Sequence, residues 1–187
     1  IDPFVEAIRK ELMTYEQLKS EGFPLETFDI GGGLGISYQS NSDVKDEDLI
    51  KSYGKLVSDM FRDFSGTVIC EPGRILVGSF GLLFAKVEYI KKSPYKNFAI
   101  LNTGMHHLMR PMLYQAHHRI YSLKESKITE VYDVVGPICE STDVLGYDRH
   151  LPKLEQGDWL VIADVGAYGR VMASGYNSHP APDELYQ

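Results

Sequence analysis

The sequence predicts an α/β segment followed by an antiparallel β domain, and two observations lead to this fold class. In the first 82 residues, segments with a helical spacing of apolar side chains alternate with short strand-like runs. From about residue 83, strand-like runs separated by turn-forming residues dominate. We therefore expect an α/β domain over residues 1–82, either a parallel sheet or part of a barrel, and a β domain over residues 83–187.

The α/β segment is expected to contain two helices and two strands. In chain order these are a helix over residues 3–20, a strand over residues 25–30, a helix opening at residues 46–48 and a strand over residues 67–70. Gly22 and Pro24 end the first helix, and the acidic side chains at the start of the second helix suit its amino-terminal dipole. This alternation indicates a parallel arrangement, although two strands cannot close a barrel.

The β domain is expected to be a succession of strands and turns. The strand-like runs cover residues 83–90, 98–101, 119–123, 131–135 and 159–163. Ser93-Pro94, Gly136-Pro137 and residues 155–158 separate them with residue types that favour turns. This pattern is typical of an antiparallel β domain.

Composition and charge argue against several classes of function. The 187 residues carry a net charge of −7, so we expect no nucleic-acid partner and no binding to acidic membranes. No apolar run approaches the roughly 20 residues that span a bilayer, and we see no secretory signal. The chain opens at Ile1 rather than Met, so we expect the true amino terminus to lie upstream. Cys70 and Cys139 do not make a disulfide framework, and a cytoplasmic location fits them best.

A run of glycines directly after the first strand is the first candidate binding element. Gly31, Gly32 and Gly33 let the backbone approach a ligand closely, and successive amide groups then form a nest for an anion such as phosphate. The alternative is a tight turn with no ligand. The run lacks the Lys-Ser/Thr ending of a nucleotide-binding P-loop.

Charged residues provide the next candidates. Glu71 and Arg74, with Gly73 between them, follow the second strand and place a carboxylate and a guanidinium at a rigid turn. The alternative is a surface salt bridge. Arg110, fixed before Pro111, is suited to docking a substrate carboxylate.

Three further motifs complete a set of five, and they occupy residues 105–114, 136–146 and 164–169 with 176–178. Taken in this order and at these spacings, the five motifs resemble the diaminopimelate decarboxylases. That family lies within the alanine-racemase-like, fold-type-III decarboxylases that depend on pyridoxal phosphate. The resemblance covers nearly the whole chain.

The resemblance implies a particular architecture. Residues 1–82 would be the C-terminal part of a TIM-type (β/α)8 barrel that binds pyridoxal 5'-phosphate, followed by an antiparallel β-barrel-like domain. The lysine that holds the cofactor covalently would lie on an early barrel strand outside this chain. The family's final strand, after Tyr186, would also be missing, so we expect this fragment alone to be inactive.

The resemblance also assigns roles to individual residues. The cofactor would be bound by Gly31, Gly32, Gly33, Glu71, Gly73, Arg74 and Tyr168. Glu71 would face the pyridine nitrogen and favour its protonated form, in which the ring withdraws electrons most strongly. Arg74 and Tyr168 would contact both phosphate and substrate.

The substrate would be bound by Arg74, Arg110, Tyr114, Glu140 and Tyr168. In a homodimer, Cys139 and Glu140 would reach across the interface into the neighbouring active site. Glu140 would recognise the far ammonium group, and Cys139 would return a proton to the substrate carbon. The implied reaction converts meso-diaminopimelate into L-lysine and carbon dioxide, a step of lysine biosynthesis.

Several alternatives remain open. Decarboxylases of ornithine, arginine or carboxynorspermidine share the mechanism. In ornithine decarboxylases, however, the stretch that corresponds to Cys139-Glu140 resembles Cys-Asp. A non-catalytic regulatory relative is the rival from another class. The sequence also departs from the family's usual pattern, with Thr142 for a glycine, His179 for an arginine and Asn102-Thr103 for Asp-Ala.

Two residue types are expected to be structural rather than functional. His106-His107 and His117-His118 suggest metal binding at first sight, but neighbours in a strand point to opposite faces, so we expect no metal site. Cys70 is expected to be an inert thiol in the core.

Overall fold

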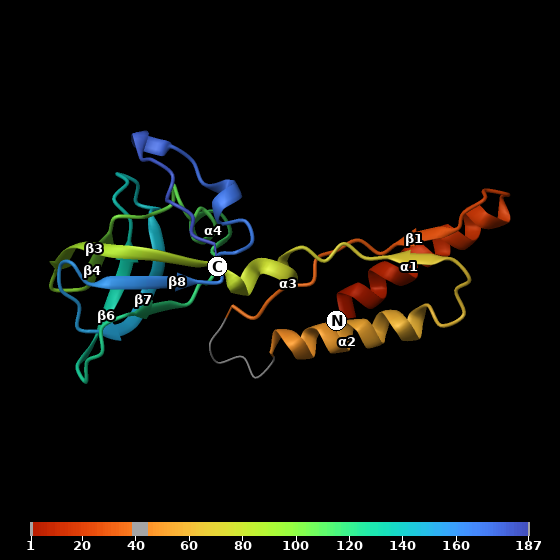
Figure 1. Ribbon diagram of the computed structural model, residues 1–187, viewed down its shortest axis with the longest axis horizontal. Coiled ribbons are helices and arrows are strands. Elements are labelled where there is room, and N and C mark those ends of the chain that lie inside the picture. The colour runs from red at the N-terminus through yellow and green to blue at the C-terminus, as the bar shows by residue number, and fades with distance from the viewer. Residues whose placement is uncertain (1, 39–44, 187) are drawn as a thin grey trace. The chain divides into compact units, whose positions relative to one another are not determined.

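The structure is a computed structural model that describes residues 2–38 and 45–186 (Figure 1). These residues form two compact units. The N-terminal unit contains the described residues up to Leu76 except Tyr38, and the sheet domain contains Tyr38 and the described residues from Val77 onward. The units thus separate between Leu76 and Val77, whereas the sequence placed the change between residues 82 and 83.

The N-terminal unit follows the expected order of helices and strands. Its elements are α1 (Asp2–Ser20), β1 (Thr27–Asp29), α2 (Asp46–Met60), β2 (Thr67–Ile69) and the start of α3 (Arg74–Val77). The strands β1 and β2 pair in parallel, with Phe28 opposite Val68. Parallel neighbours need a long crossover, and α2 lies in the connection that provides it.

An aromatic cluster packs the helices of this unit onto β1. Phe28 is buried, and its ring centroid lies 5.5 Å from that of Tyr15 on α1 and 5.1 Å from that of Phe61. The hydroxyl of Tyr15 donates to the carbonyl oxygen of Leu25 at 2.8 Å, so this buried aromatic side chain also satisfies its polar end. The cluster fixes the short strand pair and thereby the two turns that follow its strands.

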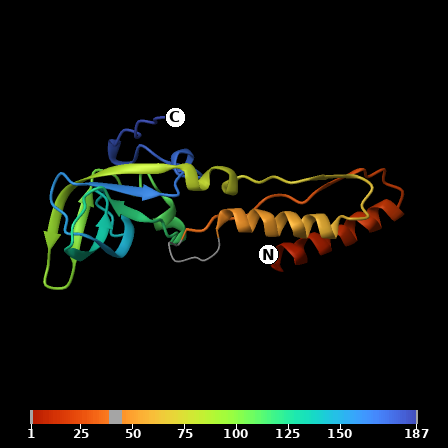
Figure 2. The same ribbon diagram turned by 60° about the horizontal axis from the view of Figure 1, so that its bottom comes forward.

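The sheet domain is built around a single sheet. Its elements are η1 (Gly78–Phe80), β3 (Leu82–Lys92), β4 (Asn97–Leu101), α4 (Arg110–Tyr114), β5 (Ile120–Ser122), β6 (Thr129–Val135), β7 (Val144–Pro152), β8 (Trp159–Ala163), η2 (Arg170–Met172) and η3 (Tyr176–Ser178). Within the described residues the strand order is β5-β8-β3-β4-β6-β7. The long strand β3 runs beside β8 in the turned view (Figure 2).

The expected antiparallel domain is in fact a mixed sheet. β4 and β6 pair in parallel, with Asn97 opposite Tyr132, whereas the other strand pairs of this sheet are antiparallel. The connection from β4 to β6 runs through α4 and β5, which is long enough to return the chain to the same end of the sheet. β5 and β7, at the two ends of the strand order, lie close together, so the sheet is nearly barrel-shaped.

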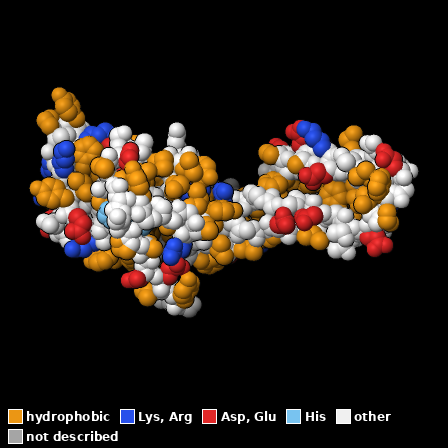
Figure 3. All heavy atoms as spheres, turned by 90° about the horizontal axis from the view of Figure 1, so that it is seen from above, with side chains coloured by type: hydrophobic (Ala, Val, Ile, Leu, Met, Phe, Trp, Pro, Cys, Tyr) orange, Lys and Arg blue, Asp and Glu red, His pale blue; other side chains and the backbone are white. Residues whose placement is uncertain are grey.

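One buried cluster holds the sheet domain together. Its members are aliphatic or aromatic side chains from the strands and adjoining loops, namely Ala85, Val87, Ala99, Leu101, Leu108, Tyr132, Val134, Leu145, Leu151, Leu154, Leu160 and Ile162. Hydrophobic side chains also reach the surface of the domain (Figure 3). Phe84 and Tyr121, which are both exposed, stand opposite Val161 on either side of β8. The outer face of β3, β8 and β5 is therefore partly apolar.

Candidate active site

The glycine run lies at the carboxyl ends of the two parallel strands of the N-terminal unit. Gly31 and Gly33 have φ angles of +64° and +97°, a region that favours glycine. The amide of Gly31 donates to Asp29 Oδ1, and its carbonyl oxygen accepts from the amide of Glu71, each at 2.8 Å. A Cβ atom on Gly32 would overlap the carbonyl oxygen of Glu71. The two turns therefore touch, and only glycine fits at position 32.

Backbone amides of this turn are available to an anion. Within the described part of the chain, the amides of Gly32 and Gly33 donate to no other residue. Glu71 and Gly73 are exposed, and Arg74 is the half-buried first residue of α3. Unused amides on a glycine turn form the kind of concavity that holds phosphate oxygens, and a nearby arginine adds a positive charge. The free amides and the arginine therefore make this turn chemically suited to an anion.

In the sheet domain, Tyr168 lies in the turn after β8 and is 45% exposed with a φ angle of +62°. The turn is held at its start by Asp164, whose buried carboxylate accepts from Nε of Arg119 at 2.7 Å and from Nη2 of the same side chain. This bidentate pair raises the pKa of Arg119. A Cβ on Gly166 would overlap the carbonyl oxygen of Val77, so the turn also packs closely against the backbone at Val77.

Arg110 opens α4 and is buried, with 5% of its surface exposed. Its Nη1 donates to Nε2 of His118 at 2.8 Å, and its guanidinium lies 4.8 Å from the ring centroid of Tyr38. Since an arginine can only donate, Nε2 of His118 has to be the unprotonated ring nitrogen, and Nδ1 then donates to the carbonyl oxygen of Ala163 at 3.0 Å. Burial is the main cause that lowers the pKa of His118 to about 4. A neutral histidine therefore orients Arg110.

Tyr114 ends the same short helix but is exposed over 62% of its surface. The next residue, Gln115, adopts a left-handed conformation with a φ angle of 53° and terminates the helix there. The two residues expected to bind substrate from this motif, Arg110 and Tyr114, thus share one helix and differ in burial.

The loop that carries Cys139 and Glu140 is fastened by a buried carboxylate. Asp143 is 2% exposed, and its two oxygens accept from the amide of Met105 at 2.6 Å and from the amide of Ile138 at 2.8 Å. The amide of Asp143 donates to the carbonyl oxygen of Glu140 at 3.1 Å, which closes the loop. Burial raises the pKa of Asp143, and the two amide donors oppose that effect. Cys139 and Glu140 themselves are exposed.

Thr142 does not disturb this loop. Its side chain is exposed, its backbone does not adopt a positive φ angle, and its carbonyl oxygen accepts from the amide of Val144 at 2.8 Å. A glycine is needed instead at Gly104 and Gly136, where a Cβ would overlap the carboxylate of Asp143. The departure from the family's glycine at Thr142 is therefore sterically tolerated.

Both exposed side chains of the loop have partners on η3. The hydroxyl of Tyr176 donates to Oε1 of Glu140 at 2.7 Å, and Nδ2 of Asn177 donates to Sγ of Cys139 at 3.7 Å. Asn177 has a φ angle of 53°, a left-handed conformation that asparagine tolerates. The fourth and fifth sequence motifs thus meet in space.

Neither histidine pair lies in a strand, and the expectation that neighbouring rings point to opposite faces is wrong for His106 and His107. The ring centroids of His106 and His107 lie 3.8 Å apart in a turn, and that of His179 lies 4.5 Å from His106. Within the residues that the structure describes, no group of three or more His, Cys, Asp or Glu side chains has the geometry to hold a metal ion.

Cys70 is exposed, so its expected place in the core is wrong. It follows the last residue of the short strand β2, where the side chain is not covered by the N-terminal unit. Cys139 is exposed too, and both thiols are free.

In the described part of the chain, none of the helices has the length and apolar character needed to cross a membrane.

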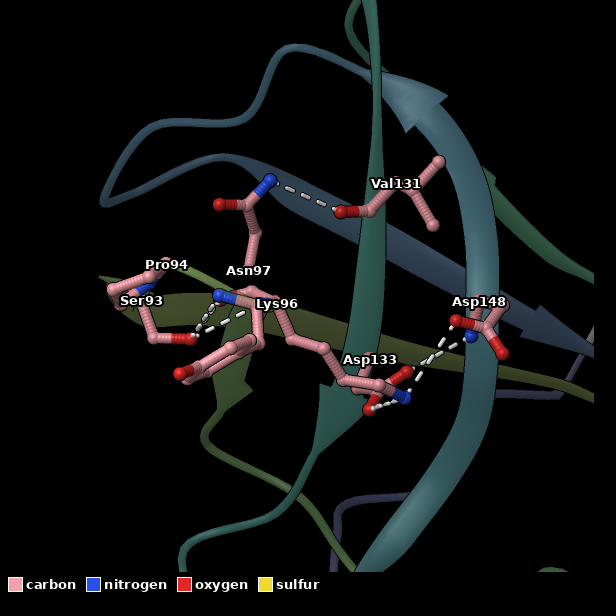
Figure 4. Close-up of a pocket in the computed structure, with 8 residues that line it drawn as sticks. Ser93, Pro94, Lys96, Asn97, Val131, Asp133 and Asp148 are labelled. Atoms are coloured by element: carbon pink, nitrogen blue, oxygen red, sulfur yellow. Dashed lines mark hydrogen bonds and ion pairs between the residues drawn. The ribbon is translucent and has the colours of Figure 1, made fainter.

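A polar cleft of about 340 Å³ lies at the turn between β3 and β4 (Figure 4). Nζ of Lys96 lies 2.8 Å from Oδ2 of Asp133 and 3.6 Å from Oδ1 of Asp148, and the amide of Asp148 donates to Asp133 at 2.9 Å. These charged groups satisfy one another, and the cleft contains none of the expected site residues. It is best explained as a structural ion-pair cluster.

Sequence reasoning missed the residues that hold the site together. Asp143, Asp164 and His118 are buried polar side chains, with relative exposures of 2%, 0% and 0%. Asp143 and Asp164 each lie within the motifs singled out above, but a sequence does not show which carboxylate turns inward. Buried polar groups require hydrogen-bond partners, and only the fold reveals those partners.

Comparison with known proteins places this arrangement in a family. Residues 13–166 match the family described as "Pyridoxal-dependent decarboxylase, C-terminal sheet domain". The chain is 43% identical over 187 residues to a diaminopimelate decarboxylase of Helicobacter pylori, an alignment that covers 99% of this chain and 45% of that protein.

Solved structures agree with the sequence comparison. A crystal structure of diaminopimelate decarboxylase from Helicobacter pylori complexed with L-lysine has a TM-score of 0.86 and 41% identity, over 96% of this chain and 44% of that one. The enzyme from Methanocaldococcus jannaschii has a TM-score of 0.87 and 40% identity, over 96% and 42%. This chain therefore spans less than half the length of these relatives, and it belongs to the pyridoxal-dependent decarboxylases, whose C-terminal sheet domain it contains.

Proposed function

We propose that the complete protein containing this chain decarboxylates meso-diaminopimelate to L-lysine and carbon dioxide, a step of lysine biosynthesis. The observation that carries the proposal is the exposed Glu140 carboxylate, held by Tyr176 in a chain that is 37–43% identical to several diaminopimelate decarboxylases. A fixed, exposed carboxylate suits the far ammonium group of a diamino acid. The complex of the Helicobacter pylori relative with L-lysine supports the same class of ligand.

The N-terminal unit fits pyridoxal 5'-phosphate as cofactor. The free amides of Gly32 and Gly33 and the lack of room for a Cβ at Gly32 describe a cradle for a phosphate group. Gly31, Gly73, Arg74 and Tyr168 would complete the phosphate contacts, and Glu71 would accept a hydrogen bond from the pyridine nitrogen and keep it protonated. When bound, this cofactor supplies an electron-withdrawing ring that stabilises the negative charge left by loss of carbon dioxide.

The sheet domain supplies the substrate contacts. Arg110 carries five N–H donors, of which His118 takes one, and the rest are suited to a substrate carboxylate. Tyr114 and Tyr168 of this domain would also contact substrate, as would Arg74 of the N-terminal unit. The thiol of Cys139, which is exposed and beside Asn177, would deliver a proton to the substrate carbon.

Assembly is part of the proposal. The strand pair β1/β2 would be a piece of a larger (β/α)8 barrel, whose other strands include the lysine that binds the cofactor. Two copies would form a homodimer in which Cys139 and Glu140 enter the partner's active site. Their exposure and the apolar outer face of β3, β8 and β5 support an intermolecular surface.

Other readings stay as rivals. Decarboxylation of carboxynorspermidine, ornithine or arginine would keep the mechanism and change only the partner of Glu140. A regulatory relative would bind through its dimer surface without turnover. A cytoplasmic location, inferred from the cysteine content, stays a prediction.

The test is carbon dioxide release by the complete gene product with pyridoxal phosphate, offered each of the four substrates separately. Selective release from meso-diaminopimelate, with lysine formed in equal amount, supports the proposal. Release from another amine overturns the substrate, and no release with bound cofactor favours the regulatory relative. Mixing Glu140→Gln with Arg74→Ala subunits tests the shared site, because a heterodimer regains one intact site and therefore part of the activity.

A further inference from the structure

The segment of residues 174–180 reaches both functional side chains of the 136–143 loop. Tyr176 donates to Glu140 and Asn177 donates to Cys139, although these partners are 36 and 38 positions apart in the sequence. The contact with Glu140 raises the pKa of the Tyr176 hydroxyl, which therefore stays protonated and donates. Tyr176 engages only Oε1 of Glu140, so this contact does not use the second carboxylate oxygen.

Three contacts fasten this segment to the turn of residues 103–107. Ser174 donates from its amide to the carbonyl oxygen of His106 at 2.8 Å. His107 uses Nε2 to donate to the carbonyl oxygen of Pro180 at 2.8 Å, because a carbonyl only accepts, and its Nδ1 faces Oγ1 of Thr103 at 2.9 Å. The rings of His106 and His179 pack against each other at an interplanar angle of 37°, with centroids 4.5 Å apart.

His106 is the middle ring of three, with its centroid 3.8 Å from that of His107 and 4.5 Å from that of His179. His106 is 1% exposed, and neither of its ring nitrogens has a hydrogen-bond partner in the described part of the chain. Burial lowers its pKa to about 4, with the neighbouring His107 and His179 as smaller causes. A neutral imidazole packs as an aromatic side chain, and His106 thereby holds His179 of the segment.

We propose that residues 174–180 form a strap that sets substrate specificity by positioning Glu140, with Tyr176 as the positioning residue and the packed rings of His106 and His179 as its anchor. The inference rests on the proposed function, because it assigns the far ammonium group of the substrate to Glu140. A glutamate side chain loses considerable rotamer freedom when it binds a cation. Tyr176 fixes the carboxylate before the substrate arrives, so less of the binding free energy is lost to ordering.

The test compares Tyr176→Phe with wild type in the complete holoenzyme, on meso-diaminopimelate and on 2-aminopimelate, which lacks the far ammonium group. Removing one hydrogen bond to a charged group is expected to raise KM for diaminopimelate roughly tenfold, with kcat changed less than about twofold. Kinetic constants for 2-aminopimelate should stay at the wild-type level. His179→Leu, which loosens the anchor, should give the same selective change, and Tyr95→Phe is the matched control because Tyr95 is 93% exposed in a distant turn.

A double-mutant cycle isolates the coupling. In a Glu140→Gln background, Tyr176→Phe should add little, because the carboxylate that it positions is gone. Equal losses on both substrates, additive effects in the cycle, or an unchanged Tyr176→Phe variant would each overturn the strap while leaving diaminopimelate turnover by wild type intact. Absence of diaminopimelate turnover by wild type overturns the proposed function, and the strap with it.

Discussion

Arg110 and His118 form a buried pair in which the histidine is the hydrogen-bond acceptor. The Nη1–Nε2 distance is 2.8 Å, and His118 is fully buried. A carboxylate in place of His118 would neutralise Arg110, whereas a neutral imidazole orients the guanidinium and leaves its positive charge for an anionic ligand. Arg110 thus keeps its positive charge in a chain of net charge −7, as the proposed binding of a substrate carboxylate requires.

This pair predicts that stability depends on pH below neutrality. The pKa of His118 is about 4 in the folded protein, below the ordinary value of 6.5, so the unfolded chain binds more protons between these values. The contribution of His118 to the free energy of unfolding should be complete above pH 6.5, fall as the pH drops towards 4 and then level off. The loss from His118 is about 3 kcal/mol at most. Urea unfolding of the protein at pH 8, 6.5 and 5 measures it.

The matched variant is His118→Gln, which keeps an acceptor for Arg110 and removes the titrating ring. It should lower stability at pH 8 and flatten the decline towards pH 5. The flattening is partial, because burial also lowers the pKa of His106 to about 4. An unchanged slope in the variant would assign the pH dependence to other groups.

The close contact of Gly32 with Glu71 predicts that the proposed phosphate cradle tolerates only glycine at this position. Gly32→Ala places a methyl group onto the carbonyl oxygen of Glu71, so the ends of β1 and β2 have to move apart. We expect a loss of roughly 1–3 kcal/mol in stability and a clear loss of cofactor retention. Gly54→Ala is the control, because Gly54 lies in α2 with open space around it, and this change should stabilise by about 0.5–1 kcal/mol. Equal cofactor titrations for the two variants would contradict the cradle.

For the cleft of Figure 4 we expect a loss of stability without a loss of turnover. Lys96→Met leaves the buried Asp133 carboxylate without its cation, which should lower the free energy of unfolding without changing turnover. Lys127→Met, at an exposed position, is the matched control and should be neutral in both measurements. A selective loss of turnover in the Lys96 variant would show that the cleft takes part in function.

Local patterns account for what the sequence predicted correctly. The helices of the N-terminal unit and most strands follow from apolar spacing and from Gly or Pro at their ends, which act within a few residues. The strand β7 was missed because Gly146 and Asp148 interrupt its alternation, and Asp148 has a φ angle of 49°. The parallel pairing of β4 with β6 was missed because strand order depends on contacts that are distant in sequence.

The candidate site likewise contains residues that the sequence could nominate and residues that only the fold reveals. Residues such as Gly31, Arg110 and Glu140 stand in motifs whose residue types suggest chemistry, so the sequence could nominate them. The side chains that support them could not be nominated, because a hydrogen bond such as that from Tyr176 to Glu140 joins residues 36 positions apart that the fold alone brings together. Cys70 shows the converse, since an apolar neighbourhood in sequence did not bury it.

Asp143 predicts that stability and site geometry are lost together when its carboxylate is changed. Asp143→Ala removes the acceptor of the Met105 and Ile138 amides, and two buried N–H groups without partners should cost about 2–4 kcal/mol. Asp143→Asn keeps one acceptor oxygen and should cost roughly half as much. Because these bonds hold the loop of Cys139 and Glu140, kcat/KM for diaminopimelate should fall in the same order. Chemical unfolding and steady-state kinetics of both variants measure the two effects, and an Asn variant with wild-type kinetics at full loss of stability would separate the loop from the site.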